Sequence, residues 1–376
     1  MRVAVFGTYD TTVHPRGAVL VEGLAEHGFG VVEVNEPLGL GTSARVGMLQ
    51  QPWRLPLLAA RLGRCWVRLL VRSRLVRGPD AVLVPYLGHF DVLLARARWP
   101  RRTVVLDYLV SGAGTARDRG VVRGPKLWLL DLLDSIATGA ADVVVVDTDE
   151  SAERLPERAR DRAVVVPVGA TRSWFDAGHR ASGGSGAGPL RVVFFGSFTP
   201  LQGTITLARA LARVAPGTLA VTLLGTGQDH AEVRRLLAGR TDITWHDWVP
   251  IDRLPTLVAG HDVCLGIFGD TAKALTVVPT KVYQGAAAGC ALLTSDTPPH
   301  RRVLGEDALL VPPGDDAALA EALRTLAADR VLVSGLKAAA AARAGGLTPG
   351  QVVAPLARVL DVSSRRRGAR WTRIAS

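Results

Sequence analysis

The sequence is poor in cysteine and in long apolar runs, and each shortage excludes a class of protein. Its three cysteines, Cys65, Cys264 and Cys290, lie far apart and lack the spacing of a metal knuckle or a redox pair, which indicates a reducing compartment. No uninterrupted apolar stretch approaches the roughly 20 residues of a membrane-spanning helix. The first ten residues break into Gly, Thr and Asp after a short apolar run, so they predict a strand rather than a signal peptide. We therefore expect a cytoplasmic protein.

Lysine is also scarce, and the formal net charge of +11 comes almost entirely from arginine. A basic chain raises the possibility of nucleic-acid binding, but that function favours clustered Lys and Arg with interleaved aromatic residues. Such clusters occur only at residues 54–77 and 363–376. Nucleic acid is therefore not expected as a partner.

Residues 54–77 predict an amphipathic helix that has two interpretations. One face carries Arg61, Arg64, Arg68 and Arg72, and another carries Leu58, Leu62, Trp66 and Leu69. Such a helix can lie on an anionic membrane surface, here the inner face of the membrane, which would suit a lipid-linked acceptor. Alternatively it packs on a sheet with its arginine face in water. The basic tail 363–376 either contacts membrane, packs on the first domain or is disordered.

Short Val, Leu and Ile runs that end in Gly, Asp or Pro alternate with longer helix-like segments along the whole chain. This alternation is typical of parallel sheets with crossover helices, so the fold class is α/β. The expected strands are 2–6, 30–34, 81–85, 103–107, 142–147 and 163–167 in the first half, and 190–195, 219–224, 243–249, 262–268, 291–295 and 308–311 in the second.

At 376 residues the chain is too long for one ordinary core and suits two domains. The segment 181–189 is nearly all small residues and predicts a flexible linker between a domain at 1–180 and a domain at 190–345. We expect residues 346–376 to form a helix and basic tail that packs back toward the first domain or is partly disordered. Doubly wound sheets bind ligands at the carboxyl ends of their strands, so the residues after each strand are the candidates.

In the second half, the strand at 190–195 runs through Gly-Ser-Phe-Thr-Pro-Leu-Gln-Gly into a helix expected at 204–214. Gly196, Thr199 and Gly203 lie in that turn, where glycine lets a phosphate approach backbone amides at a helix N-terminus. Gly225 lies in a similar turn after the next strand. Such turns also serve simple chain reversal, and both interpretations remain open.

The stretch 265–297 carries a more specific pattern. Pro279 and Thr280 predict the start of a helix, with Lys281 in its first turn and Gln284 one turn later on the same face. A lysine is disfavoured near a helix N-terminus unless an anion is present, which points to a bound diphosphate. Lys273, in a polar loop after a buried strand, can add positive charge.

The segment LGIFGDTAKALTVVPTKVYQGAAAGCALLTSDTPP, with FFGSFTPLQG before it and LLVPPGD after it, resembles the donor domain of glycosyltransferase family 4 (glycosyl transferases group 1). It is similar in particular to a subgroup with FGxFxPLxG and LGIFGxTxKA…KVYQ motifs. In the first half GTYD, GHFD and VVVDTDE resemble the N-terminal domain of that subgroup. The resemblance implies a GT-B fold of two Rossmann-like domains facing across a cleft. It also implies a nucleoside-diphosphate-sugar donor and retention of the anomeric configuration. We expect metal-independent transfer to a hydroxyl of a glycan, lipid-linked precursor or small metabolite, with no cofactor.

The sequence departs from the family at several charged positions. Ser197 and Gln202 stand where many members have Arg and Lys, Gln284 stands at the second Glu of the family's Glu-x7-Glu pattern, and Arg302 replaces a common acidic residue. Lys273 and Lys281 must then hold more of the phosphate charge. A catalytically weak nucleotide-sugar-binding protein is the alternative.

The acceptor side is expected on the loops of the first half. Asp107, at a strand end, is the candidate to anchor the donor sugar or acceptor, with Ser111 in the loop that follows, and His89 is the second catalytic candidate. Asp107 alternatively caps a turn, and His89 alternatively has a structural role. Gly7 and Arg16 flank the end of the first strand, where Arg16 either pairs with a phosphate or an acidic acceptor or is solvated.

Asp147, Thr148 and Asp149 imitate the Asp-x-Asp metal signature of the other major glycosyltransferase fold. That interpretation needs a single domain with a bound divalent ion. Two sheet repeats and a linker argue against it. Asp147 is therefore expected to be a strand-end residue, and no metal site is predicted.

Overall fold

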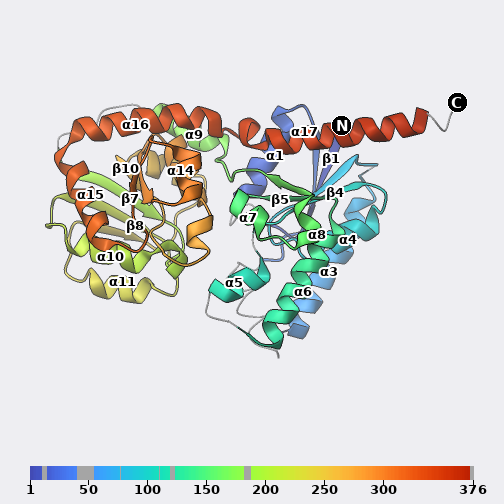
Figure 1. The fold of residues 1–376 in the computed structure, drawn as a ribbon, viewed down its shortest axis with the longest axis horizontal. Helices are drawn as coiled ribbons and strands as arrows, with labels where there is room; N and C mark the ends of the chain where they lie inside the picture. Colours follow the sequence, from blue (N-terminus) through green and yellow to red (C-terminus); the bar gives the residue numbers. More distant parts are fainter. Residues whose placement is uncertain are drawn as a thin grey trace. The chain divides into compact units, whose positions relative to one another are not determined.

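The computed structural model divides the chain into two compact units (Figure 1). Unit 1 comprises Met1–Pro167 and Pro349–Ser376, and unit 2 comprises Val168–Thr348. The structure describes residues 1–10, 15–39, 55–76, 78–109, 111–118, 123–181 and 188–372. Helix α9 (Arg172–Arg180), expected in the first domain, lies in unit 2 instead, and most of the expected linker 181–189 is outside the described residues.

Unit 1 is built on a six-stranded parallel sheet in the order β2-β1-β3-β4-β5-β6. All six strands that the sequence predicts are present. Their bounds are β1 Arg2–Gly7, β2 Gly30–Asn35, β3 Ala81–Val84, β4 Thr103–Asp107, β5 Val143–Val146 and β6 Ala163–Val165. Strands β3, β4 and β5 are short and buried on both faces, as their continuous apolar runs require.

Helices cover both faces of this sheet. One face packs against α1 and α17, whose shared core includes Leu20, Leu24, Val353 and Leu356. Gly23 makes this packing possible, because a β-carbon there would lie 2.4 Å from the carbonyl oxygen of Pro349. The other face is covered by α3, α4, α6 and the short helices that follow. The bounds are α1 Arg16–Glu26, α3 Leu55–Ser73, α4 Asp91–Arg98, α5 Gly112–Asp118, α6 Pro125–Ala140, α7 Asp149–Glu153, α8 Glu157–Arg160 and α17 Pro349–Thr372.

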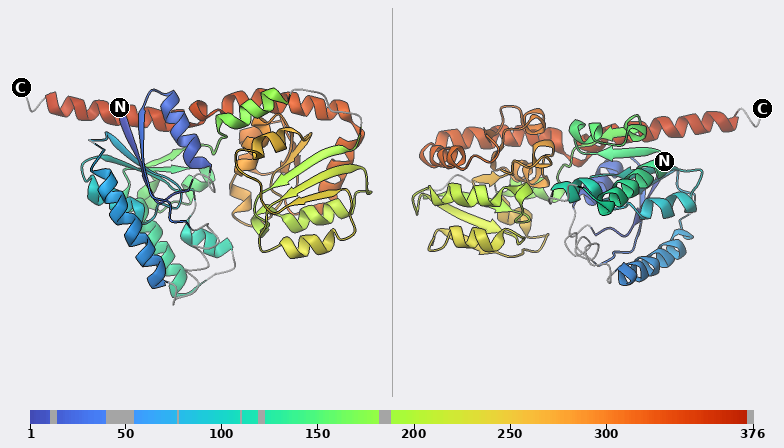
Figure 2. Two further views of the ribbon diagram at one scale, coloured as in Figure 1. Left: turned by 180° about the vertical axis from the view of Figure 1, so that it is seen from behind. Right: turned by 60° about the horizontal axis from the view of Figure 1, so that its bottom comes forward.

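Unit 2 repeats the plan with a six-stranded parallel sheet in the order β12-β11-β10-β7-β8-β9 (Figure 2). The six strands predicted for the second half are present, some of them shorter than expected. Their bounds are β7 Leu190–Phe195, β8 Leu219–Leu224, β9 Ile243–His246, β10 Val263–Leu265, β11 Ala291–Ser295 and β12 Leu309–Val311.

The helices of unit 2 also divide between the two faces of their sheet. Helices α10, α11 and α15 share one core with alternate residues of β7, β8 and β10. Helix α13 packs on the opposite face, where a β-carbon on Gly285 would lie only 2.6 Å from the sulfur of Cys264. The remaining bounds are α10 Thr204–Ala212, α11 His230–Leu236, α12 Leu254–Ala259, α13 Thr280–Ala287, α14 Pro298–Leu304, α15 Asp316–Ala328 and α16 Arg330–Ala344.

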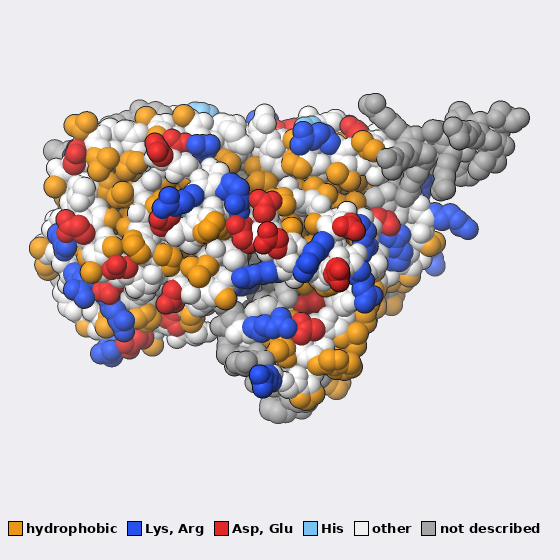
Figure 3. Space-filling model, in the orientation of Figure 1, with side chains coloured by type: hydrophobic (Ala, Val, Ile, Leu, Met, Phe, Trp, Pro, Cys, Tyr) orange, Lys and Arg blue, Asp and Glu red, His pale blue; other side chains and the backbone are white. Residues whose placement is uncertain are grey.

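Acidic and basic side chains are interspersed over the face of the molecule drawn in Figure 3, with apolar side chains between them. This mixture differs from the continuous basic surface that nucleic-acid binding favours. Within the described residues, no helix combines the length and hydropathy required to cross a bilayer.

Candidate functional site

The first glycine-flanked turn of unit 2 follows β7 and is held in a defined shape. Gly196 has φ 140° and Gly203 has φ 66°, both in the region that favours glycine. A β-carbon on Gly203 would lie 2.3 Å from the backbone nitrogen of Gly269, so the turn packs directly on the loop after β10. The amide of Phe268 donates to the carbonyl of Gln202 across this contact. The backbone conformation and this close packing therefore require glycine at position 203, independently of any phosphate binding.

The second turn, Gly225 to Gly227, packs on the first. The amide of Gly196 donates to the carbonyl of Leu224, and the amide of Phe198 donates to that of Thr226. A β-carbon on Gly225 would lie 1.9 Å from the carbonyl oxygen of Gly196. The absence of a side chain at Gly225 is thus explained by loop packing, and its expected contact with a ligand stays a prediction.

Helix α13 begins at Thr280, after the extended residue Pro279, as the sequence predicts. Lys281, in its first turn, is only 5% exposed and does not extend into solvent. Its side-chain nitrogen lies 3.6 Å from the ring centroid of Phe194 on β7. A β-carbon on Gly196 would be 3.2 Å from the same nitrogen. Two residues 85 positions apart, each predicted separately as a phosphate contact, are therefore brought together at the carboxyl end of β7.

Gln202 completes this cluster, although the sequence marked it only as a departure from the family. Its side-chain oxygen would lie 3.7 Å from a β-carbon on Gly196. Within the described residues, neither this oxygen nor the nitrogen of Lys281 has a hydrogen-bond partner, and both atoms are buried. Buried polar atoms are normally paired, so two orphans at one position indicate a site that receives a polar ligand.

The buried position of Lys281 changes its acid–base behaviour. Burial disfavours the charged ammonium and lowers its pKa to about 7, against the usual value of 10.5. An anion placed beside the nitrogen would reverse this shift. Lys281 is therefore expected to take up a proton, and so become positively charged, when a negatively charged group binds beside it.

The other donor-side candidates differ in burial. Gln284 is 5% exposed on α13, and Thr199 and Thr280 are partly buried. Lys273 is also partly buried and precedes the short 3-10 helix Ala274–Thr276, where its carbonyl accepts from the hydroxyl of Thr276. Contacts of these four residues with a diphosphate or ribose remain predictions.

In unit 1, two candidate site residues are paired with each other. The Nε of Arg16 donates to a carboxylate oxygen of Asp107 at 2.8 Å, and the side chains are 2% and 0% exposed. Arg16 also donates to the carbonyls of Val166 and Pro167, so the solvated alternative for Arg16 is wrong. Burial raises the pKa of Asp107, although Arg16 opposes the shift. The other carboxylate oxygen of Asp107 is buried without a hydrogen-bond partner among the described residues, so the contact of Asp107 with a sugar or acceptor stays a prediction beside its structural pairing.

Gly7 lies beside Asp91, the last residue of the GHFD motif, which the sequence did not mark as a candidate site residue. The amide and hydroxyl of Thr8 donate to one carboxylate oxygen of Asp91 at 2.7 and 2.8 Å. The indole of Trp66 donates to the other oxygen at 2.9 Å. A β-carbon on Gly7 would lie 3.0 Å from Asp91. Asp91 thus fixes the turn after β1 and connects it to α3.

His89 and Ser111, also predicted for this edge, meet at a third residue, Asp134. The Nε2 of His89 lies 3.0 Å from one carboxylate oxygen, and the hydroxyl of Ser111 donates to the other at 2.6 Å. The amides of Gly112 and Ala113 donate to Asp134 as well, so this residue of α6 caps the N-terminus of α5. Burial acts to raise the pKa of Asp134, but these contacts outweigh it and lower the pKa below its usual value.

The Asp-Thr-Asp sequence after β5 forms a helix cap. The hydroxyl of Thr148 accepts from the amide of Ser151 at the start of α7, and the hydroxyl of Ser151 donates to Asp147 at 2.7 Å. Burial raises the pKa of Asp147. Asp147 is a strand-end residue, as predicted.

Comparison with known proteins identifies the architecture. Residues 189–329, which make up most of unit 2, match the family model described as glycosyl transferases group 1. Sucrose-phosphate synthase from Thermosynechococcus elongatus matches with a TM-score of 0.66 and 16% identity, over 100% of each chain. Anabaena HepE in complex with UDP and glucose matches with a TM-score of 0.65 and 13% identity, over 96% of this chain and 100% of that one. The fold is GT-B.

A third structure with the GT-B fold is an α,α-trehalose-phosphate synthase (UDP-forming) from Burkholderia vietnamiensis, with a TM-score of 0.65 and 14% identity over 96% of this chain and 97% of that one. No curated protein matches the chain in sequence. In this GT-B chain the family match covers the cluster of Gly196 and Lys281, and the narrower subgroup stays a prediction.

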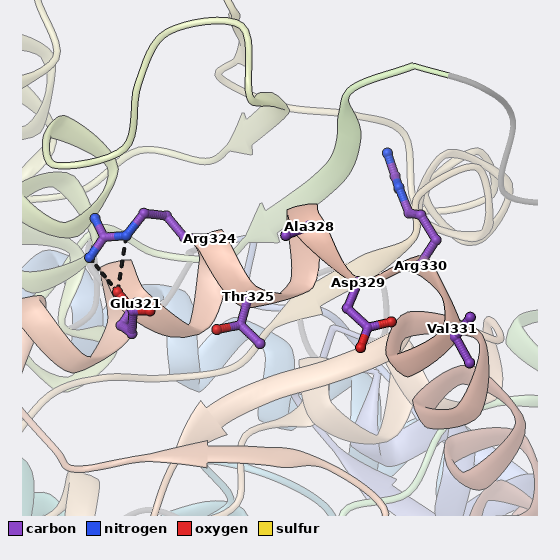
Figure 4. A pocket seen from close by; sticks show the side chains of 7 residues that line it. All are labelled: Glu321, Arg324, Thr325, Ala328, Asp329, Arg330 and Val331. Carbon is purple, nitrogen blue, oxygen red and sulfur yellow. Dashed lines mark hydrogen bonds and ion pairs between the residues drawn. The ribbon is translucent and has the colours of Figure 1, made fainter.

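A surface hollow of about 670 Å³ lies away from this cluster, where α15 meets α16 (Figure 4). Glu321 and Arg324 pair across its wall, and Asp329 accepts from the amide of Leu332 to cap α16. Its charged groups therefore already have structural partners. One guanidinium nitrogen of Arg330, which lines the hollow, is buried without a hydrogen-bond partner among the described residues, but another nitrogen of Arg330 donates to the carbonyl of Gly188.

Proposed function

We propose that this protein is a glycosyltransferase that moves a sugar from a nucleoside-diphosphate sugar to a hydroxyl acceptor. The acceptor is a glycan, a lipid-linked precursor or a small metabolite, and it binds on unit 1. Transfer proceeds with retention of the anomeric configuration and without a divalent metal ion. The match of residues 189–329 to glycosyl transferases group 1 supports the reaction class.

One observation carries the proposal: the buried nitrogen of Lys281 lies against Gly196 and has no hydrogen-bond partner among the described residues. A diphosphate supplies the missing partner. The absence of a β-carbon at Gly196 lets a phosphate oxygen approach, and the N-terminus of α13 adds backbone amide donors. HepE has been solved with UDP and with UDP-glucose, which supports a nucleotide-sugar donor for the same fold.

The proposed chemistry follows from this placement. The bond between the anomeric carbon and the diphosphate oxygen breaks, and the acceptor hydroxyl oxygen bonds to the same face of that carbon. The acceptor proton passes to the departing diphosphate, so the products are a glycoside and a nucleoside diphosphate. Protonated Lys281 stabilises the negative charge that develops on the diphosphate, and the effect is large because the nitrogen is shielded from water.

Gln202, Gln284 and Ser197 provide fewer charges than the family usually has, which supports a second candidate. A nucleotide-sugar-binding protein with weak catalysis would keep Lys281 and Gly196 but turn over slowly. Binding and turnover must therefore be measured separately.

The test is turnover of UDP-, GDP- and dTDP-sugars in the presence of EDTA, with release of the nucleoside diphosphate as the readout. An enzyme hydrolyses or transfers at least one of these donors, and Lys281→Ala loses most of that activity. Binding without turnover supports the second candidate. Failure of every nucleotide sugar to bind, or binding only with added divalent metal, would contradict the proposal.

A further inference from the structure

Helix α6 exposes an apolar face where an amphipathic helix normally places polar residues. Its exposed large side chains are Trp128 at 66%, Leu129 at 59%, Leu132 at 40% and Ile136 at 47%. Their spacing of three and four residues aligns them in one stripe along the helix. We call these four residues the α6 stripe.

The two acidic residues of α6 lie off this stripe. Asp134 is buried and caps α5, and Asp131 pairs with Arg117 at 2.8 Å. Ala137 lies on the side of the helix that packs on the sheet. The apolar face is therefore an exposed feature of a helix whose other sides are already packed or paired.

Helix α3 adds positive charge on the same layer of unit 1. Leu69 of α3 and Ala137 of α6 belong to one core, so both helices cover the same face of the sheet, and α4 contacts each of them. Residues Leu55–Ser73 include no acidic residue. The exposed residues of α3 include four arginines and three large apolar residues: Arg61, Arg64, Arg68, Arg72, Leu57, Val67 and Val71.

Among the residues that the structure describes, acidic partners are found for only part of this charge. Glu36 pairs with Arg72 at 2.8 Å and lies 3.8 Å from Arg68. Apolar side chains gather on the lower part of unit 1 in Figure 3, over α3 and α6. The exposed Trp, Leu and Ile side chains of α6 and the exposed arginines of α3 belong to the same helical layer, and together they match the chemistry of a lipid interface that bears phosphate groups.

A second copy of the chain is a less suitable partner for this surface of α3 and α6 than a lipid membrane is. A symmetric dimer through this surface would bring the arginine rows of two α3 helices toward each other. Like charges at close range oppose such a contact, whereas anionic lipid headgroups complement them.

We propose that unit 1 binds anionic membrane surfaces, with the α6 stripe entering the interfacial layer and the arginines of α3 pairing with lipid phosphates. This inference is independent of the proposed transferase activity. It predicts a peripheral mode of attachment that depends on both apolar contact and charge.

The test is flotation of the full chain with vesicles of phosphatidylcholine alone and of phosphatidylcholine mixed with phosphatidylglycerol. We expect binding to the mixed vesicles, weakened by salt, and little binding to phosphatidylcholine alone. Leu129→Glu combined with Leu132→Glu should weaken binding by about tenfold or more, because apolar burial provides much of the affinity. Arg61→Glu combined with Arg64→Glu should weaken it by about tenfold and reduce its salt dependence.

Val331→Glu is the matched control, since Val331 is 83% exposed but lies on α16 of unit 2. It should bind vesicles as the wild type does. Thermal unfolding of each variant checks the fold, and Trp128→Ser provides a milder change on the α6 stripe.

Failure of the wild type to bind the mixed vesicles, or equal binding by the α6 stripe variants, would overturn the inference. So would a wild-type dimer, seen by light scattering, that the same variants dissociate.

Discussion

The side-chain nitrogen of Lys281 lies 3.2 Å from the position that a β-carbon on Gly196 would occupy. The two residues belong to different elements, one at the start of α13 and the other at the end of β7. Together they place a buried amine, which an incoming anion would protonate, beside a backbone position that has no side chain. That combination is the physical basis of the proposed diphosphate site.

Replacing Gly196 with alanine should impair nucleotide binding. The new methyl group would press on Lys281, and φ 140° is unfavourable for any residue with a β-carbon. We expect UDP affinity to fall by about tenfold or more, because a phosphate bound there would lose both space and its cation. Gly217→Ala is the control: Gly217 has φ 80° but nothing within 4 Å of an added β-carbon. Equal UDP affinity in the two variants would count against the site.

Lys281→Met should stabilise the nucleotide-free protein while weakening UDP binding. Methionine keeps the apolar stem and removes a buried nitrogen without a hydrogen-bond partner, so the free energy of unfolding should rise by about 1 kcal/mol or more. Chemical denaturation and calorimetry measure the two effects. Lys337→Met, which replaces a partly exposed lysine near Asp262, should leave UDP affinity unchanged. A less stable Lys281→Met variant would mean that Lys281 has a structural role.

UDP affinity should decrease as the pH rises above about 7. Burial lowers the pKa of Lys281 to about 7, so above that pH the free protein must take up a proton before it binds a diphosphate. The unfolded chain retains the usual pKa of 10.5, so it binds more protons than the folded one between these values, and stability should rise with pH across that window. Calorimetry in buffers of different ionisation enthalpy measures the proton uptake. A pH-independent affinity that Lys281→Met leaves unchanged would contradict this linkage.

Removing one partner of the buried Arg16–Asp107 ion pair should lower the free energy of unfolding. Removing both partners should change it much less. Arg16→Met leaves the Asp107 carboxylate buried without its counter-charge, at a cost of about 3–5 kcal/mol. Combining Arg16→Met with Asp107→Leu should recover most of this loss in urea denaturation. If the double variant folds and keeps activity, Asp107 has a structural role. A stable double variant that binds UDP but has no turnover would instead support the catalytic assignment.

Asp134→Asn should loosen α5 without changing UDP affinity. The carboxylate accepts from Ser111 and from two backbone amides, and asparagine offers only one acceptor oxygen. We expect a loss of about 1–3 kcal/mol in unit 1 stability. Because the folded pKa of Asp134 is lowered, its contribution is present above the usual value of 3.8 and is lost as the pH falls through the folded pKa. Hydrogen exchange of the α5 amides reports the effect, and unchanged exchange would show that the cap is not needed.

The strand plan of both units could be predicted from the sequence because buried parallel strands are continuous apolar runs. The start of α13 could also be predicted, since Pro279 precedes it in an extended conformation. These features depend on local sequence. The boundary between the units could not be placed correctly, because α9 is a short helix whose packing partners in unit 2 lie far along the chain.

The contacts within each site were harder to predict because they join distant positions. Arg16 and Asp107 are 91 residues apart, and nothing in their local sequence indicates that they neutralise each other. Asp134 lies in the middle of a helix, where an acidic residue is ordinarily solvated, yet it caps another helix. The sequence suggested what Lys281 would bind, but only the fold reveals that its nitrogen is buried against Gly196.

Calorimetric titration of UDP into the full chain in the presence of EDTA, for the wild type and Lys281→Met, is the most direct measurement. The account predicts metal-independent binding by the wild type, accompanied by proton uptake above pH 7, and loss of both in the variant. Wild-type binding that requires a divalent ion, or equal binding by the two proteins, would contradict it.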